Sequence, residues 1–205
     1  GSIDDLDSLR AGAAASDGVV HLAYNHDFSR MDEAAQTDRQ AIEAFGEVLE
    51  GTDRPLVIAS GVLGMTLGRT ATERDRPDPT THPRIANAEA ALALVNRGVR
   101  SAVVRFAPTA HGAGDHGFVA RLVEIARDKG VSGYIADGAS RWPAVHRLDA
   151  AKLVRLAVDD APAGSVLQAI GEEGVPTRAI AEAIGRGLQL PVVSIPAKQA
   201  GDHFG

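Results

Sequence analysis

The sequence contains no cysteine, no long apolar run and no excess of basic residues. Without cysteine, the 205-residue chain has no disulfide framework, no thiol nucleophile and no thiolate metal site. No apolar run approaches the roughly 20 residues that a membrane-spanning helix needs. The formal net charge is -6, and the Lys and Arg residues are scattered rather than clustered. We therefore expect a cytoplasmic protein that binds neither nucleic acid nor a membrane.

Several catalytic sequence motifs are missing as well. There is no His-Glu-x-x-His and no carboxylate cluster at metal-ligand spacing, so no metal is predicted. There is no Gly-x-Ser-x-Gly elbow, which argues against a hydrolase nucleophile. No glycine-rich phosphate loop follows a first strand. The segment 112–114 (Gly-Ala-Gly) comes closest, but it lacks the third spaced glycine, so a substrate-side loop is favoured over a phosphate cradle.

The apolar run Val19–Ala23 is the stretch around which the rest of the chain can be organised. It follows Asp17 and Gly18 and gives way abruptly to polar residues. An uninterrupted run of this length predicts a strand buried on both faces, as in a parallel sheet. Ligands of open α/β sheets bind just past the carboxyl ends of such strands, which places Tyr24, Asn25 and His26 at a candidate site.

Further apolar runs alternate with amphipathic segments along the chain, and all can be interpreted as neighbours of the first strand. Strands are expected at 56–61, 101–106, 133–136, 144–148, 166–170 and 191–195. Helices are expected at 6–15, 31–50, 84–96, 118–129, 149–158 and 176–187, with a loop over 64–81 and a polar tail over 200–205. This alternation predicts an α/β fold, a parallel sheet with helices on both faces, together with a smaller lobe.

The polar candidates each have a structural alternative. Ser60 ends the second strand, where its hydroxyl either bonds a substrate oxygen or caps a turn, and the sequence does not decide between these roles. His21 lies within a strand and is favoured as a hydrogen-bonded core residue. Trp142 is interpreted as a packing anchor or one wall of a pocket. Four other histidines occupy strand-end loops, where each can act as an acid or base: His26, His111, His116 and His146.

Four segments resemble the extended short-chain dehydrogenase/reductases, the NAD-dependent epimerase/dehydratase family. Residues 17–23 (Asp-Gly-Val-Val-His-Leu-Ala) resemble its fourth-strand motif, and 56–61 resemble its fifth strand, which carries the active-site Ser or Thr. Residues 103–112 are similar to the Arg-Pro…Tyr-Gly segment, and 142–151 to the valine-histidine-x-x-aspartate segment. The resemblance implies a Rossmann-like sheet without its N-terminal βαβ half in 1–112. It also implies a substrate lobe in 113–205, which contains the returning strand and helix of the sheet.

The resemblance also implies an activity and a set of site residues. The implied activity is an NAD(P)-dependent oxidoreductase or epimerase-like reaction on a small hydroxyl or carbonyl compound, with NAD or NADP as cofactor. Ser60 would polarise the substrate oxygen and Tyr24 is the first candidate for the proton donor, with His82 and His111 as weaker ones. Residues implied to contact the cofactor are His21, Leu22, Ala23, Asn87, Pro108 and Thr109, and those implied to contact substrate are Asn25, His111, Trp142 and His146.

The chain departs from the family at its beginning. It starts partway through the Rossmann half, without the first strand and the glycine-rich diphosphate loop. The strand at 19–23 would then be a long apolar edge of the sheet, and such edges pair with something. We expect a fragment of a longer protein, with a partner chain, such as a homo-oligomer, or a rearrangement as alternatives. These 205 residues are expected to bind a dinucleotide weakly or not at all.

The second departure is at the catalytic pair. The family's Tyr-x-x-x-Lys is replaced by Pro83 and Asn87, so the expected active site is atypical. Proline cannot transfer a proton, and Asn87 can bond a ribose hydroxyl but carries no charge. A non-catalytic dinucleotide sensor or interaction protein of the same fold is therefore the alternative function.

Overall fold

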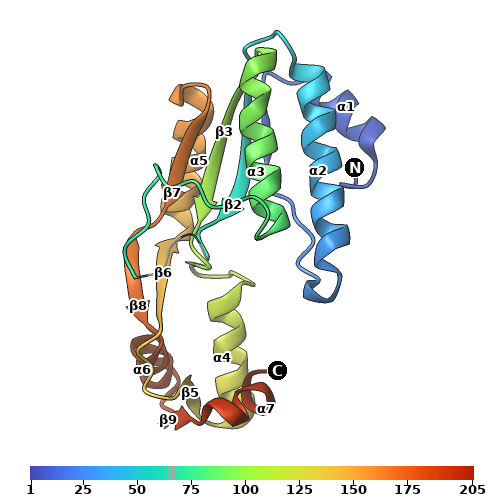
Figure 1. The fold of residues 1–205 in the computed structure, drawn as a ribbon. Helices are drawn as coiled ribbons and strands as arrows, with labels where there is room; N and C mark the ends of the chain where they lie inside the picture. The colour runs from blue at the N-terminus through green and yellow to red at the C-terminus, as the bar shows by residue number, and fades with distance from the viewer. Residues whose placement is uncertain (64, 66–67) are drawn as a thin grey trace. The chain divides into compact units, whose positions relative to one another are not determined.

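The computed structural model describes residues 1–63, 65 and 68–205, which form two compact units (Figure 1). The first unit comprises residues 1–106 and 151–169, and the second comprises 107–150 and 170–205. In this part of the chain, none of the helices combines the length and the apolar character that crossing a membrane requires.

The first unit is built on a four-stranded parallel sheet in the order β1-β2-β3-β7. Its strands are β1 (Val19–His21), β2 (Pro55–Gly61), β3 (Arg100–Phe106) and β7 (Ser165–Ala169). The two central strands β2 and β3 are buried along almost their whole length. This is the pattern of a parallel sheet covered on both faces, and it confirms the predicted α/β class.

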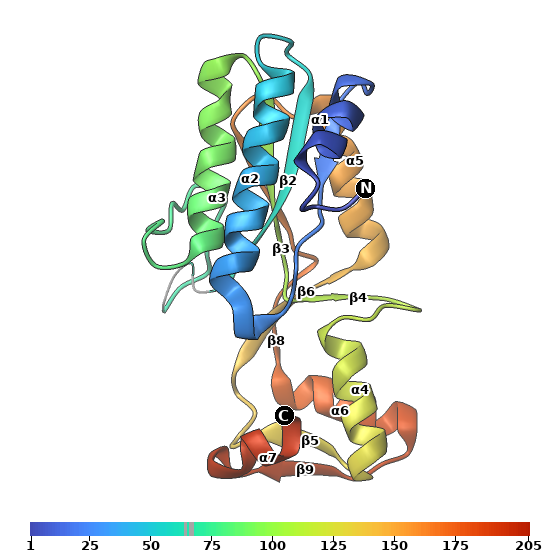
Figure 2. The same cartoon turned by 90° about the vertical axis from the view of Figure 1, so that its right-hand side faces the viewer.

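Helices cover both faces of this sheet (Figure 2). The helices α2 (Met31–Leu49) and α3 (Pro83–Ala93) lie on one face, and α1 (Leu6–Ala14) packs on α2. The helix α5 (Arg147–Asp160), most of which belongs to this unit, lies on the other face. The apolar core between α2, α3, β2 and β3 includes Ile42, Phe45, Leu49, Leu56, Ile58, Leu94, Val99 and Val103.

Local sequence signals explain where the helices of this unit begin and end. In α2, buried residues recur at helical spacing, and Asp32 and Glu33 lie in the first turn, where carboxylates suit the helix dipole. Proline at the first position of α3 loses no hydrogen bond. After α3, the 3₁₀ helix η2 (Leu94–Arg97) ends at Gly98, whose φ of 71° is left-handed and favours glycine.

The second unit contains two small sheets and three α-helices among its described residues. One sheet has the order β4-β6-β8, in which β4 and β6 are parallel and β6 and β8 antiparallel, and the other pairs β5 with β9 in parallel. The elements are β4 (Thr109–His111), α4 (Phe118–Lys129), β5 (Ser132–Ile135), β6 (Arg141–His146), β8 (Glu172–Pro176), α6 (Thr177–Leu188), β9 (Val192–Ile195), the 3₁₀ helix η3 (Ala197–Gln199) and α7 (Ala200–Phe204).

Three expectations about the strands are wrong. The first strand is not buried on both faces, because β1 lies at the edge of the sheet and ends at His21; Val20 and Leu22 are each 45% exposed. The later apolar runs are not all neighbours of β1, since β5 with β9 and β4 with β6 form sheets of their own. The strand expected at 144–148 is β6, which starts earlier and ends at His146, and α5 begins at the next residue, Arg147.

Three short elements were not predicted at all. The strand β4 follows Pro108 directly, β8 begins in the acidic pair Glu172 and Glu173, and the polar tail forms α7. Each is only three to five residues long, so none carries a measurable periodicity. The expected loop at 64–81 contains no helix or strand in its described residues, 65 and 68–81, and residues 64, 66 and 67 lie outside the described part.

Candidate functional site

The chain becomes polar at the carboxyl end of β1, and Tyr24 is partly buried there. The Arg84 guanidinium lies over the Tyr24 ring, with its central carbon 4.1 Å from the ring centroid. The His26 ring meets the same phenol ring edge-on, at a centroid distance of 5.4 Å. Tyr24 is thus held between a cation and an imidazole at the sheet edge where parallel sheets bind ligands.

Arg84 also connects Tyr24 to the end of β2. One of its terminal nitrogens, Nη2, donates a hydrogen bond to the carbonyl oxygen of Ala59 at 3.4 Å. Ala59 immediately precedes Ser60, whose side chain is 7% exposed. Arg84 therefore contacts both strand ends that carry the two predicted catalytic residues.

The start of α3 fixes the position of Arg84. His82 precedes the helix, and its Nδ1 accepts a hydrogen bond from the Arg84 backbone N–H at 3.2 Å. Pro83, which is expected from the sequence to be at the position of the catalytic tyrosine, is exposed and occupies the first turn of the helix.

The surroundings of Tyr24 act on its acidity in opposite directions. Partial burial raises the pKa of Tyr24, because an apolar environment disfavours the charged phenolate. The Arg84 cation opposes this rise in pKa, and the negative charge of Asp38 adds to it. The phenol therefore keeps its proton at neutral pH, as a proton donor must.

A buried hydrogen-bond network lies behind β1. His21 Nε2 is 2.8 Å from Asp38 Oδ1, and both side chains are less than a tenth exposed. The Asn87 amide nitrogen donates to Asp38 Oδ2 at 2.7 Å and to the Ala35 carbonyl oxygen at 2.8 Å. The network joins β1, α2 and α3, and each of its three buried side chains has at least one hydrogen-bond partner.

This network bears on two of the predicted residues. His21 is a buried, hydrogen-bonded core residue, as its position within a strand predicted. Asn87 is 5% exposed, and both hydrogens of its amide nitrogen are used by protein acceptors. Only Oδ1 remains for a ribose hydroxyl, so the predicted cofactor contact of Asn87 would have to be made as an acceptor.

Asp75 forms several hydrogen bonds within residues 69–75, which follow β2 in the chain. Arg69 and Asp75 form a two-pronged ion pair, and the Thr72 backbone N–H also donates to the carboxylate. These hydrogen bonds hold the pKa of Asp75 far below its usual value, and the bond from Arg69 has the largest effect. The Arg105 side chain, 4% exposed at the end of β3, donates to the Asp75 carbonyl oxygen at 3.1 Å.

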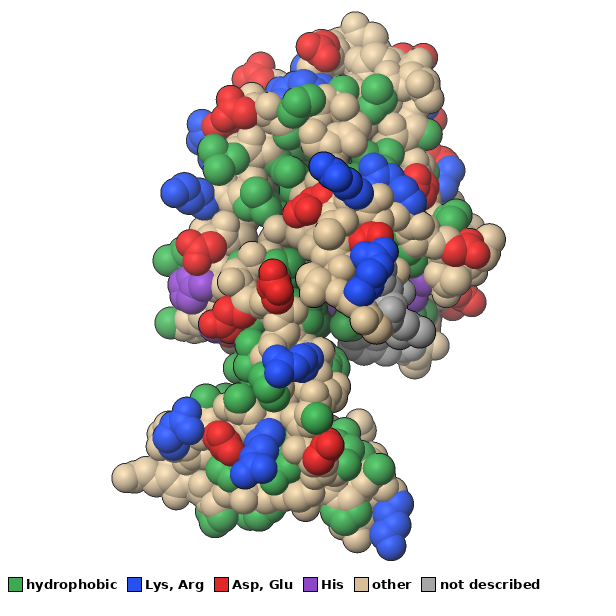
Figure 3. Space-filling view, turned by 60° about the vertical axis from the view of Figure 1, so that its left-hand side comes forward, with side chains coloured by type: hydrophobic (Ala, Val, Ile, Leu, Met, Phe, Trp, Pro, Cys, Tyr) green, Lys and Arg blue, Asp and Glu red, His purple; other side chains and the backbone are tan. Residues whose placement is uncertain are grey.

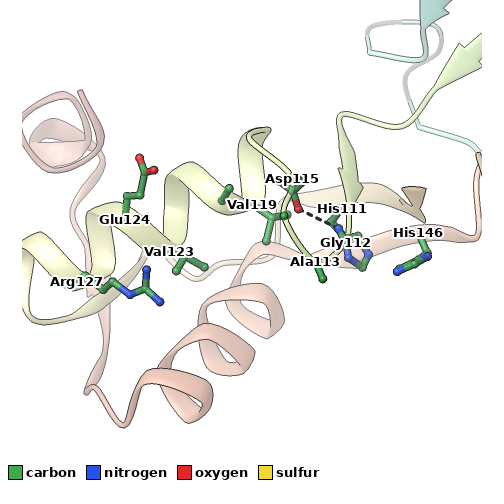
Figure 4. A pocket seen from close by; sticks show the side chains of 11 residues that line it. His111, Gly112, Ala113, Asp115, Val119, Val123, Glu124, Arg127 and His146 are labelled. Carbon is green, nitrogen blue, oxygen red and sulfur yellow. Dashed lines mark hydrogen bonds between the residues drawn. The ribbon is translucent and has the colours of Figure 1, made fainter. Parts of the chain in front are cut away.

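The second unit contains a pocket of about 600 Å³ (Figure 4). His111 from β4 and His146 from β6 lie at one end of it, with ring centroids 6.0 Å apart and the rings perpendicular. Val119, Val123 and Arg127 extend into it from one side of α4 (Figure 4). The pocket thus offers two imidazoles and one guanidinium beside a small apolar wall.

The imidazole of His146 is oriented by the helix that follows it. Its Nδ1 accepts a hydrogen bond from the Leu148 backbone N–H at 3.3 Å, so the neutral ring carries its proton on Nε2. That nitrogen is then the donor available to a ligand.

The loop 112–117 folds around Asp115. The carboxylate accepts hydrogen bonds from the backbone N–H groups of Gly112 at 2.9 Å and Gly117 at 3.0 Å. These bonds lower the pKa of Asp115, and the bond from Gly112 has the largest effect. Two N–H groups that a phosphate cradle would need are therefore already occupied. This argues against a phosphate cradle in this loop, and its role as a substrate-side loop stays a prediction.

The remaining predicted residues are placed as follows. Thr109 is 1% exposed, and its hydroxyl donates to the Pro143 carbonyl oxygen, so its predicted contact with a cofactor stays a prediction. Trp142 stacks on Phe118 at 4.5 Å with nearly parallel rings, and it is not among the residues that line the pocket. Leu22, Ala23 and Asn25 are exposed, and Pro108 is half-buried. Tyr24, Ser60 and Asn87 belong to the first unit, whereas Thr109, His111 and His146 belong to the second.

Sequence reasoning missed Arg84 and Asp38, although both carry a detectable signal. Asp38 interrupts the buried stripe of α2 with a carboxylate, which requires a buried partner. Arg84 lies in the first turn of α3, where the helix dipole disfavours a cation. In each case the residue type conflicts with its local position, and the contacts described above explain the conflict.

One face of the molecule shows how the charged side chains of the described residues are distributed. On the face drawn in Figure 3, acidic and basic side chains of the described residues alternate and do not gather into a stripe of one sign. A nucleic-acid interface usually presents such a basic stripe.

Comparison with solved structures defines the class of fold. The chain is similar to the dTDP-glucose 4,6-dehydratase DesIV of Streptomyces venezuelae, solved with NAD bound, with a TM-score of 0.77 and 20% identity, over 96% of this chain and 66% of that one. It is also similar to the UDP-glucose 4-epimerase of Thermotoga maritima, with a TM-score of 0.76 and 17% identity, over 100% of this chain and 72% of that one. The fold is thus the Rossmann-like fold of NAD-binding epimerases and dehydratases.

Two fungal proteins match the whole chain in sequence. Uncharacterized protein C2A9.02 of Schizosaccharomyces pombe is 46% identical over 207 residues, covering 100% of this chain and 70% of that protein. Uncharacterized protein YLL056C of Saccharomyces cerevisiae is 40% identical over 206 residues, covering 100% and 69%. The chain therefore belongs to the family of these two proteins. No model of a known protein family matches it.

Proposed function

We propose that this chain carries the catalytic residues of an NAD(P)-dependent oxidoreductase or epimerase-like enzyme acting on a small hydroxyl or carbonyl compound. The observation that carries the proposal is the contact of Arg84 with both Tyr24 and Ala59, the neighbour of Ser60. A phenol and a hydroxyl lie at the carboxyl ends of adjacent parallel strands, where this fold binds its ligands.

In this proposal the two side chains have separate roles. The Ser60 hydroxyl donates a hydrogen bond to the substrate oxygen, which stabilises negative charge as it develops there. The Tyr24 phenol gives its proton to the same oxygen during carbonyl reduction and takes it back in the reverse direction. Burial of Tyr24 keeps the phenol protonated until the oxygen becomes basic enough to receive the proton.

The residues after β1 fit a dinucleotide only in part. Leu22 and Ala23 are exposed beside the sheet edge and can contact a cofactor that supplies or accepts the hydride. The sequence contains no strand, glycine-rich loop and helix in succession to hold a diphosphate. Calorimetry with NAD and NADP should therefore detect little or no binding to these 205 residues, and a micromolar Kd would contradict this.

The pocket of the second unit is proposed to bind the substrate. Its two imidazoles offer hydrogen bonds to hydroxyl or carbonyl groups, and the valines of α4 offer an apolar wall. Changing His146 to Phe keeps the ring but removes its donor. This variant is expected to raise KM with little change in kcat, because the lost contact is made equally in the ground state and the transition state.

The proposed roles are tested by turnover of the natural protein, that is, the protein as it exists in the cell with any sequence that accompanies these 205 residues. The assay uses NADH or NADPH and a panel of aldehydes and ketones. Tyr24→Phe and Ser60→Ala are each expected to lower kcat/KM by about 100-fold or more. Tyr134→Phe, at the other tyrosine of the chain, is the matched control and should retain full turnover. Unchanged turnover in both Tyr24→Phe and Ser60→Ala would reject these roles.

A second candidate function is a dinucleotide-binding sensor or interaction protein without catalysis. The observation that favours it is the buried Asn87, whose amide is bonded to Asp38 and Ala35 at the position where the family has a lysine. Cofactor binding to the natural protein, without hydride transfer to any carbonyl in the panel, would support this alternative. If no dinucleotide binds the protein as it exists in the cell, with any sequence that accompanies these 205 residues, both functions are wrong.

A further inference from the structure

Arg84 occupies a place that needs an explanation. It lies in the first turn of α3, where the partial positive charge of the helix end repels a cation. Among the described residues, no carboxylate lies within ion-pair distance of it, whereas eight other arginines form such pairs. The features that favour its charge are the Ala59 carbonyl oxygen and the face of the Tyr24 ring.

Three contacts hold the guanidinium in this orientation. The backbone N–H is fixed by His82, Nη2 donates to the Ala59 carbonyl oxygen, and the planar group lies 4.1 Å from the Tyr24 ring centroid. Its Nε is buried and has no acceptor in the described part of the chain. A buried donor without an acceptor lowers the stability of the folded protein. An arginine that is kept over a phenol in spite of this loss of stability is expected to have a role in the site.

We propose that Arg84 is a positioning residue for Tyr24: its guanidinium holds the phenol ring in place and favours the loss of its proton. This inference rests on the proposed role of Tyr24 as the proton donor. A cation over the ring face stabilises the negative charge that spreads into the ring when the proton leaves, and the hydrogen bond to Ala59 keeps that cation fixed.

The other charged and titratable groups near Tyr24 set the direction of the test. Arg84 faces the phenol from α3, Asp38 acts on it from α2, and His26 contacts its ring from the same segment. Asp38 disfavours the phenolate and Arg84 favours it. Removing the charge of Arg84 must therefore raise the pKa of Tyr24 further.

The direct test is an NMR titration of the protein with 13C-labelled tyrosine ring carbons. The chain has only two tyrosines, so Tyr134→Phe assigns both signals. Arg84→Gln retains a donor for the Ala59 carbonyl but loses the charge, and we expect the Tyr24 titration to move to higher pH. Arg84→Lys keeps the charge and should restore most of the shift. Arg178→Met, which removes the arginine beside Tyr134, is the matched control and should leave Tyr24 unchanged.

The activity of the natural protein provides the second readout. In Arg84→Gln, kcat/KM for a carbonyl substrate should fall about 3- to 10-fold, and the alkaline limb of the pH profile should move to higher pH. A merely structural role would lower activity without moving that limb. If Arg84→Gln does not fold, Arg84→Met makes the same comparison, with circular dichroism as the check.

The outcomes separate this inference from the function on which it rests. If the Tyr24 titration of the folded charge-free variant stays where it is in the natural protein, the role of Arg84 is wrong. If the titration moves but Tyr24→Phe retains full turnover, Arg84 does act on the phenol and the assignment of Tyr24 as proton donor is wrong. If both the titration and the alkaline limb move, both statements stand.

Discussion

The two units of this protein differ in the kind of side chain that is completely buried. In the first unit, the largest fully buried side chains are almost all aliphatic, among them Ile42, Leu49 and Leu56. In the second, those in the same class are Thr109 and Ser132, and each hydroxyl donates to a backbone carbonyl oxygen. The smaller unit completely buries fewer large aliphatic side chains, so we expect its two buried hydroxyls to matter for its stability.

Each unit also contains one tyrosine with an arginine near its ring. The two pairs differ in distance and in the other partners of the arginine. In the first unit the guanidinium carbon of Arg84 is 4.1 Å from the Tyr24 centroid. In the second, that of Arg178 is 5.6 Å from Tyr134, and Arg178 also bonds Glu182 at 2.9 Å. The charge of Arg178 is thus shared with a carboxylate on the surface, whereas that of Arg84 is directed at the phenol. Proximity of Arg and Tyr in sequence or space does not by itself define a site.

The largest expected effect tests the apolar core of the first unit. Leu56→Ala removes a side chain with no exposed surface from the central strand β2, and we expect a loss of about 2–5 kcal/mol in the free energy of unfolding. Leu22→Ala is the matched control: Leu22 is 45% exposed, so the same truncation should cost less than about 0.5 kcal/mol. Urea unfolding measures both, and equal losses would contradict this account of the core.

A smaller effect tests the hydrogen bonds of the second unit. Thr109→Val and Ser132→Ala each leave a buried carbonyl oxygen without its hydroxyl donor, and each should cost about 1–3 kcal/mol. Hydrogen exchange of the peptides from β4 and β5 measures this loss locally. Ser194→Ala removes an exposed hydroxyl that bonds Ala136 in the same unit and should change exchange little. Unchanged protection in both buried variants would show that the hydroxyls are dispensable.

The smallest effect concerns the pH dependence of the segment after β2. The folded state holds the pKa of Asp75 below its unfolded value, so its contribution to stability is present above about pH 4 and is lost as the pH falls further. In Asp75→Asn, the free energy of unfolding should therefore fall less steeply with decreasing pH than it does in the unsubstituted protein. Arg69→Gln removes the first cause of the shift and should behave in the same way. Parallel acid-unfolding curves for all three proteins would contradict the prediction.

The sequence alone predicts the regular elements of the first unit well, because their signals are local. Apolar runs such as 56–61 and 101–106 favour the interior of a parallel sheet, and both lie there. The amphipathic period of α2 and the Pro and Gly punctuation of α3 fix those helices to within a few residues. In the second unit, β4 and β8 are too short for a pattern, and they exist because β6 offers them a partner.

The candidate site divides in the same way. The sequence by itself determined which strand ends are polar, and so indicated Tyr24, Ser60, His111 and His146 as candidates. Only the tertiary structure decided that Arg84 covers Tyr24, that Asp38 engages Asn87, and that Trp142 is stacked on Phe118. The physical reason is range: strand and helix signals act between near neighbours in the chain, whereas a cation and a phenol sixty residues apart in number meet only once the sheet has aligned β1 with β2.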